Sequence, residues 1–236
     1  MHLVSVQESE VHYLPYNGQR YSARPDISGT SDRLSLPVRL PVLTTHSNDS
    51  GYSYSLRLKV EGTENIPKDG PLVIASNHLS LLDPPVLGTA ATRKVHFMAK
   101  EELFVPVLGT IYKILGAFPV RRGGADRVAI KHGIDILESG QVLAIFPEGT
   151  RSKTGELGKA QPGALMMASK AKATIVPACI IGTDYKRHGR IWPKVTVRFG
   201  KPMPFPEDAV VKKEFLHAMT EELMQHIAKL QAGEDV

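Results

Sequence analysis

The chain has 236 residues, of which 42% are hydrophobic and 22% charged, so it can bury a substantial core as one globular domain. Its formal net charge of +5 suits anionic partners such as phosphate groups, acidic carrier proteins or an anionic lipid surface. A single cysteine, Cys179, excludes an intrachain disulfide and a cysteine-based zinc site, and no apolar run reaches the roughly 18 residues of a membrane-spanning helix.

The first 50 residues differ from the rest of the chain in composition. They are rich in Ser, Thr and Pro and show no sustained helical or strand period. Four Arg and no Lys against five acidic residues leave them a formal charge of −1, so the basic character belongs to residues 51–236. We predict an irregular N-terminal segment over 1–50, disordered or loosely attached, and a folded domain over 51–236.

After this segment, short apolar runs alternate with amphipathic stretches. The apolar runs predict strands at Leu56–Glu61, Leu72–Ser76, Val95–Ala99, Ala117–Val120, Val142–Phe146, Ile175–Ile181 and Val195–Phe199. The stretches between them predict helices at Pro85–Ala91, Glu102–Leu115, Ala125–Ser139, Pro162–Lys172 and Asp208–Leu230. This alternation predicts an α/β fold, a single domain with a mixed, mostly parallel central sheet flanked by helices. Ligands of such folds gather at the carboxyl ends of strands.

A polar group follows the predicted strand Leu72–Ser76, namely Asn77, His78 and, after four further residues, Asp83. An imidazole has a pKa of about 6.5, so with a carboxylate on one ring nitrogen it can take a proton from a hydroxyl at neutral pH. On a continuous helix the two side chains would lie about 140° apart, and Pro84 disfavours a helical Asp83. We therefore predict a turn that folds the carboxylate onto the ring, with Asn77 holding its backbone. The alternative is a His and an Asp that cap the next helix.

A second polar block, from Phe146 to Ser152, follows the predicted strand Val142–Phe146. Gly149 lets backbone N–H groups approach an anion, while Arg151 offers a planar fork suited to phosphate. The alternative is a solvated loop with a surface Glu and Arg pair.

A third cluster, Arg121 and Arg122, ends the predicted strand Ala117–Val120. Neighbouring side chains of a strand point to opposite faces, so one of the two arginines can face a site. The alternative is a basic surface turn, and Lys100 at the end of Val95–Ala99 is a weaker candidate of the same kind. Cys179 could in principle form an acyl-enzyme, but its apolar neighbours indicate a buried, inert thiol.

In order and spacing, these blocks resemble the four motifs of the glycerolipid acyltransferase family typified by 1-acylglycerol-3-phosphate acyltransferase. The resemblance runs from about Leu58 to Phe199 and rests on Asn77-His78 with Asp83, Gly116-x-Phe118 with Arg121, Phe146 to Ser152, and Val176-Pro177. It implies transfer of a fatty acyl group from a thioester, on coenzyme A or acyl carrier protein, to the free hydroxyl of 1-acylglycerol-3-phosphate, giving phosphatidate. It implies no metal and no other cofactor.

The resemblance also implies roles for individual residues. His78 would be the base and Asp83 its partner. The residues implied to bind the substrate are Phe118, Arg121, Glu148, Gly149, Thr150, Arg151 and Pro177. Two alternatives stay open: an acyltransferase for another lyso-lipid or an amino-acid lipid, and a non-catalytic lipid-binding protein of the same fold.

The partners implied by the resemblance are lysophosphatidate, acyl-CoA or acyl carrier protein, and a membrane surface, with no nucleic acid. We expect a peripheral protein at the cytoplasmic face of the membrane. Many members of this family carry apolar helices at the N-terminus, and residues 1–50 show no such helix. Attachment is therefore expected through the basic face, through a partner, or through exposed apolar residues such as Leu103, Phe104, Val105 and Val107.

Overall fold

The computed structural model describes residues 57–121, 126–184, 194–205 and 212–234. The predicted N-terminal segment and its boundary at residue 50 lie outside these residues, as does Arg122.

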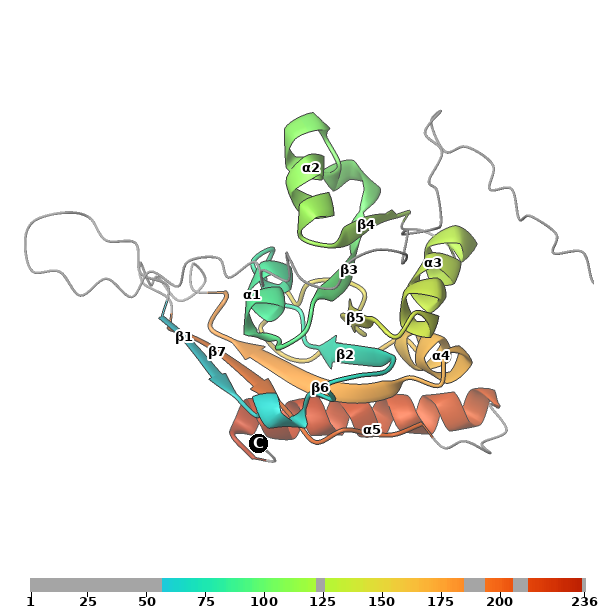
Figure 1. Ribbon diagram of the computed structural model, residues 1–236. Coiled ribbons are helices and arrows are strands. Elements are labelled where there is room, and N and C mark those ends of the chain that lie inside the picture. Colours follow the sequence, from blue (N-terminus) through green and yellow to red (C-terminus); the bar gives the residue numbers. More distant parts are fainter. Residues whose placement is uncertain (1–56, 122–125, 185–193, 206–211, 235–236) are drawn as a thin grey trace, which may run out of the picture. The chain divides into compact units, whose positions relative to one another are not determined.

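The described residues are organised around one seven-stranded sheet with the order β1-β7-β6-β2-β5-β3-β4 (Figure 1). In chain order the strands are β1 (Arg57–Glu61), β2 (Leu72–Ser76), β3 (Val95–Lys100), β4 (Ala117–Val120), β5 (Val142–Ile145), β6 (Thr174–Ile181) and β7 (Lys194–Phe199). Strands β6, β2, β5, β3 and β4 run parallel, whereas β7 is antiparallel to β6 and carries β1 parallel to itself. The predicted mixed, mostly parallel sheet is confirmed.

The described residues form five α-helices, of which α1 to α4 lie between strands and α5 follows the last strand. They are α1 (Asp83–Ala90), α2 (Pro106–Ile114), α3 (Arg127–Glu138), α4 (Gly163–Lys170) and α5 (Lys213–Ala232), joined by the 3₁₀ turns η1 (Thr63–Asn65) and η2 (Glu101–Leu103). The single helix predicted over Glu102–Leu115 is therefore two elements. Val105 precedes Pro106, whose ring disfavours a helical conformation at the residue before it, so α2 begins only at Pro106.

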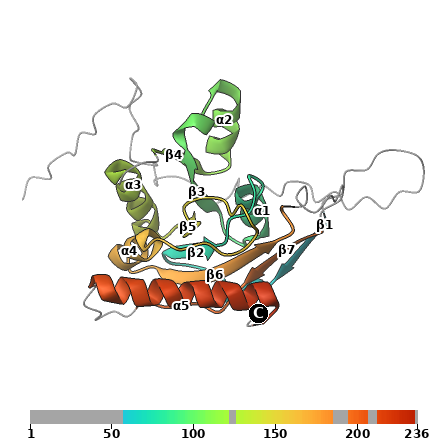
Figure 2. The same cartoon turned by 180° about the vertical axis from the view of Figure 1, so that it is seen from behind.

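The sheet is covered on both faces, which explains why every residue of β2 is buried. Alternate residues of β2 enter two separate clusters: Val73 and Ala75 pack with α3, α4 and α5, whereas Leu72 and Ile74 pack with α1. Figures 1 and 2 show α5 lying along one face of the sheet and α1 on the other. Met219, Leu223 and Ile227 of α5 are buried, so the predicted stripe of this helix is core.

This topology determines where the polar blocks lie. Strands β2 and β5 are parallel neighbours, and β6 is the parallel neighbour of β2 on its other side. The loops that leave the carboxyl ends of these three strands therefore lie next to one another, at the same end of the strands.

Candidate active site

The loop after β2 brings His78 and Asp83 together. His78 Nδ1 lies 2.8 Å from Asp83 Oδ2, and the two residues are only 8% and 0% exposed. The predicted turn is confirmed, and no side-chain hydrogen bond caps α1. The expectation that Pro84 keeps Asp83 out of the helix is wrong. Helix α1 begins at Asp83, and Pro84 and Pro85 occupy its first turn. Proline is tolerated there because backbone N–H groups of the first turn make no hydrogen bond within the helix.

The carboxylate of Asp83 accepts four hydrogen bonds. Oδ2 accepts from His78 Nδ1, from Leu79 N at 2.6 Å and from Ser80 N at 2.7 Å, while Oδ1 accepts from Thr183 Oγ1 at 2.5 Å. A carboxylate is only an acceptor, so Nδ1 of His78 carries the proton of this contact. The neutral imidazole is thereby left with its lone pair on Nε2, the form that a general base requires.

The loop after β5 holds His78 from the other side. Its ring stacks on Phe146 with the centroids 4.2 Å apart, its backbone N donates to Glu148 Oε1 at 3.1 Å, and its carbonyl accepts from Ser152 N at 2.8 Å. The other oxygen of Glu148 accepts from Gly158 N at 2.8 Å. Within the described part of the chain, Nε2 of His78 has no hydrogen-bond partner. The imidazole is thus fixed in position while its basic nitrogen is left for a ligand.

Asn77 anchors the start of the same turn to β6. Its Nδ2 donates to the carbonyl of Ile180 at 2.9 Å, and its Oδ1 accepts from Ile180 N at 2.7 Å. The backbone pairing of β2 with β6 ends at Ser76, and the side chain of the next residue, Asn77, continues the hydrogen bonding to β6. Asn77 was predicted to hold the backbone of the turn; its carboxamide instead bonds to the backbone of Ile180 and so fastens the start of the turn to β6.

Known proteins resemble this chain in sequence and in fold. Residues 57–181 match the family model described as Acyltransferase. The chain belongs to the acyltransferase family. The resemblance to 1-acylglycerol-3-phosphate acyltransferases is therefore confirmed at the level of the family.

Several acyltransferases are similar to this chain in sequence or in structure. The 1-acyl-sn-glycerol-3-phosphate acyltransferase of Bacillus subtilis is 36% identical over 177 residues, covering 74% of this chain and 88% of that protein. The chloroplastic enzyme LPAT1 of Arabidopsis thaliana is 35% identical over 58% of this chain, which spans only 38% of that protein. The crystal structure of the acyltransferase PlsC from Thermotoga maritima superposes with a TM-score of 0.60 at 30% identity, covering 75% of this chain and 73% of that one.

The residues of the loop after β5 that are predicted to bind the substrate divide into two kinds. Thr150 and Arg151 are exposed, and no described residue pairs with the Arg151 guanidinium. Gly149 has a φ of +68°, a conformation that glycine adopts without strain. Both carboxylate oxygens of Glu148, in contrast, accept hydrogen bonds from backbone N–H groups, so this residue shapes the loop around His78.

The other residues that are predicted to bind the substrate lie in the sheet or at the end of one of its strands. Arg121 is exposed at the end of β4, where its Nε donates to Glu101 Oε2 at 3.0 Å. Phe118 is buried in β4 with its ring edge-on to His132, and Pro177 is buried in β6. Pro177 and Phe118 therefore pack within the acyltransferase domain, and their roles in binding substrate stay predictions.

Thr183 is the site residue that sequence reasoning missed. It is 100 positions from Asp83 in the chain, yet its hydroxyl contacts the buried carboxylate. The available signal was its place two residues after the end of the apolar strand β6, the same place that His78 occupies after β2.

Cys179 can be set aside as a nucleophile. It is fully buried in β6, and burial raises the pKa of its thiol to about 12. At neutral pH the group is a protonated, inaccessible thiol, as its apolar neighbours predicted.

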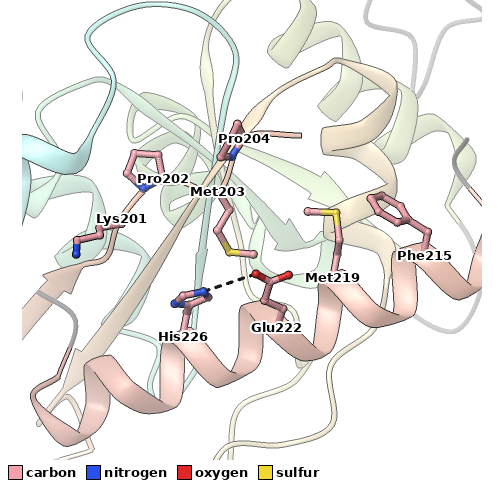
Figure 3. Close-up of a pocket in the computed structure, with 8 residues that line it drawn as sticks. All are labelled: Lys201, Pro202, Met203, Pro204, Phe215, Met219, Glu222 and His226. Carbon is pink, nitrogen blue, oxygen red and sulfur yellow. Dashed lines mark ion pairs between the residues drawn. The ribbon is translucent and has the colours of Figure 1, made fainter. Parts of the chain in front are cut away.

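A hollow of about 360 Å³ lies between α5 and the segment that follows β7 (Figure 3). Its lining residues are Lys201, Pro202, Met203, Pro204, Phe215, Met219, Glu222 and His226. These described residues include none from the loops after β2 and β5. The hollow therefore does not contribute to the site built around His78.

Proposed function

We propose that this protein transfers a fatty acyl group from a thioester of coenzyme A or acyl carrier protein to the free hydroxyl of 1-acylglycerol-3-phosphate. The product is phosphatidate. The observation that supports this most is the 2.8 Å contact between His78 Nδ1 and Asp83, which engages one ring nitrogen and leaves Nε2 available to act as the base. Relatives that carry the same reaction in their names support the choice of acceptor.

The reaction follows from this geometry. Nε2 of His78 takes the proton of the acceptor hydroxyl as its oxygen attacks the thioester carbonyl. The carbon–oxygen ester bond forms, the carbon–sulfur bond breaks, and the imidazolium returns its proton to the departing thiolate. Asp83 holds the ring in the required tautomer and stabilises the imidazolium. The thioester is already activated and the base is a side chain, so the proposed reaction needs neither a metal nor a covalent acyl-enzyme.

Arg151 is proposed to bind the phosphate of the acceptor, with the hydroxyl of Thr150 beside it. The exposed guanidinium has no partner among the described residues, so it can take a bidentate contact with phosphate oxygens. Arg121 already pairs with Glu101 and would have to exchange that carboxylate for the ligand. Fixing the phosphate places the attacking hydroxyl, which lowers the barrier through positioning.

Replacing Arg151 with alanine is expected to raise the KM for lysophosphatidate by about 10- to 100-fold, the loss expected for a hydrogen-bonded charged group, while kcat changes only a few-fold. The reason is that the contact is made to the phosphate, which does not change during the reaction. Initial rates over a range of acceptor concentrations measure both constants. Lys153→Ala, which removes an exposed cation two residues away, is the matched control. A fall in kcat at unchanged KM would assign Arg151 to the chemical step instead.

We propose that the protein works at the cytoplasmic face of the membrane, where acyl-CoA and acyl carrier protein are present. No helix in the described part of the chain is both long and apolar enough to cross a bilayer. Leu81, in the turn between His78 and Asp83, is 53% exposed and Val105, after η2, is 52% exposed, and these exposed apolar side chains support contact with lipid. Of the other apolar residues expected here, Leu103 and Phe104 are half-buried, and the side chain of Val107 lies outside the described residues.

The function is tested with the purified full chain and a grid of donors and acceptors. Acyl-CoA and acyl carrier protein thioesters are each offered with lysophosphatidate and with other lyso-lipids, and both thiol release and the acylated lipid are measured. We expect phosphatidate to be formed with at least one donor and to be absent with His78→Ala. If neither thioester is consumed with lysophosphatidate above the His78→Ala background, the proposal is wrong. Turnover with another lyso-lipid alone would reassign the acceptor.

A further inference from the structure

A buried hydroxyl, on Thr183 just beyond the carboxyl end of β6, donates a hydrogen bond to the carboxylate of Asp83. Thr183 Oγ1 donates to Asp83 Oδ1 at 2.5 Å, and the two residues are 2% and 0% exposed. The three N–H groups that bond to the carboxylate all go to its other oxygen, Oδ2. Among the described residues, Thr183 is the partner of Oδ1.

The chain makes a tight turn that brings this hydroxyl to the site. Gly182, between the end of β6 and Thr183, has a φ of +89°, and a Cβ there would lie 2.2 Å from the carbonyl oxygen of Lys194. Only glycine fits this position, since a side chain would clash with backbone. Two residues before Gly182, Ile180 is held by the carboxamide of Asn77. The end of β6 is therefore fastened to the catalytic turn at two points.

We propose that Thr183 is a positioning residue for the acyl-transfer reaction, acting through Asp83 on the orientation of His78. This inference rests on the function proposed above. With Oδ1 held by the hydroxyl, Oδ2 stays directed at Nδ1, and the imidazole keeps its basic nitrogen turned toward the acceptor. Without the hydroxyl, a fully buried carboxylate oxygen loses its partner, and the carboxylate can rotate away from the ring. Thr183 is 2% exposed and its hydroxyl bonds to Asp83, so we expect its effect on kcat rather than on substrate binding.

Thr183→Val tests the role because it keeps the shape of the side chain and removes the donor. We expect it to lower kcat by about tenfold, the size expected for losing a hydrogen bond to a charged group, with the KM of both substrates changed less than about twofold. Thr183→Ser keeps the hydroxyl and should restore kcat to within a few-fold of the wild-type value. Thr220→Val is the matched control. It is also a buried threonine, 5% exposed, whose hydroxyl donates to the carbonyl of Leu216 within α5.

A double-substitution cycle separates positioning from general loss of structure. If Thr183 acts through Asp83, then Thr183→Val should change kcat hardly at all in a chain that already carries Asp83→Ala. A purely structural role would lower kcat by the same factor in both backgrounds. If Thr183→Val does not fold, Thr183→Ala replaces it in the cycle.

The outcomes are distinct from failure of the proposed function. Wild-type turnover with unchanged kcat in Thr183→Val, an equal fall in both backgrounds, or no recovery with Thr183→Ser would each overturn the positioning role. Absence of turnover in the wild-type chain would instead overturn the function itself. A loss with Thr220→Val that matches the loss with Thr183→Val would show that any buried threonine has the same effect, which also contradicts the proposal.

Discussion

Replacing His78 with alanine is expected to lower kcat by about a thousandfold, within the range of 10² to 10⁴ that general-base catalysis contributes. The expected loss is large because Nε2 is the nitrogen that takes the proton from the acceptor. The other described partners of Asp83 are two backbone N–H groups and the hydroxyl of Thr183, and none of these can replace an imidazole as the base. The KM for lysophosphatidate should change little, since phosphate binding is assigned to the loop after β5. Rates at saturating concentrations of both substrates measure the effect.

Two controls accompany the His78 variant. The imidazole also stacks on Phe146, so alanine leaves a gap that could loosen the turn. Thermal unfolding of the variant followed by circular dichroism distinguishes this from loss of the base. His132→Ala makes the same substitution on α3, where the ring packs against Phe118, and should leave kcat within about twofold if loss of an imidazole alone has no effect. A His78→Ala protein that keeps more than a tenth of the wild-type kcat would remove His78 from the chemical step.

Asp83→Asn is expected to lower kcat by about 10² to 10⁴, with a much smaller effect on KM, as when the acid of a catalytic triad is replaced by its amide. The contacts of the carboxylate indicate how the asparagine will sit. Its carbonyl oxygen should take the place of Oδ2, where two backbone N–H groups donate, and its amide group should face Thr183. A threonine hydroxyl can accept as well as donate a hydrogen bond, so it can accept from the amide group of the asparagine. No two donors then face each other, and the protein should fold.

The loss in Asp83→Asn then comes from charge. A neutral carboxamide cannot stabilise the imidazolium that forms as the acceptor loses its proton. Steady-state kinetics give the division between kcat and KM, and the free energy of unfolding from urea titration reports the fold. Asp135→Asn, at an exposed position of α3, is the matched control. A variant with raised KM and unchanged kcat would place Asp83 in substrate binding, contrary to the contacts it makes.

The strands and the catalytic turn could be predicted from the sequence because their signals are local. The apolar runs that form β2, β5 and β6 stand out from polar flanks, and each ends where a polar block begins. The five-residue step from His78 to Asp83 does not fit one face of a helix, which is why a turn could be inferred. The turn and the helix that follows it share Asp83, and this overlap explains the wrong expectation about Pro84.

The contacts that hold the site together could not be predicted, because they depend on which strands are neighbours. Thr183 reaches Asp83 only because β6 lies beside β2, although three strands separate them in the chain. The stacking of Phe146 on His78 likewise follows from the pairing of β5 with β2. Arg121 was predicted to bind the substrate because of its residue type. Its ion pair with Glu101 depends on the segment that joins β3 to α2, which the sequence did not place.

The central claim is that His78 activates the acceptor for direct transfer from the thioester, and rapid mixing without acceptor tests it most directly. Purified protein is mixed with an acyl thioester alone, free thiol is followed with time, and lysophosphatidate is then added. We predict no release of thiol beyond slow hydrolysis until the acceptor arrives, and then release that is absent in His78→Ala. A burst of thiol equal to the enzyme concentration before the acceptor is added would demonstrate an acyl-enzyme and contradict the claim.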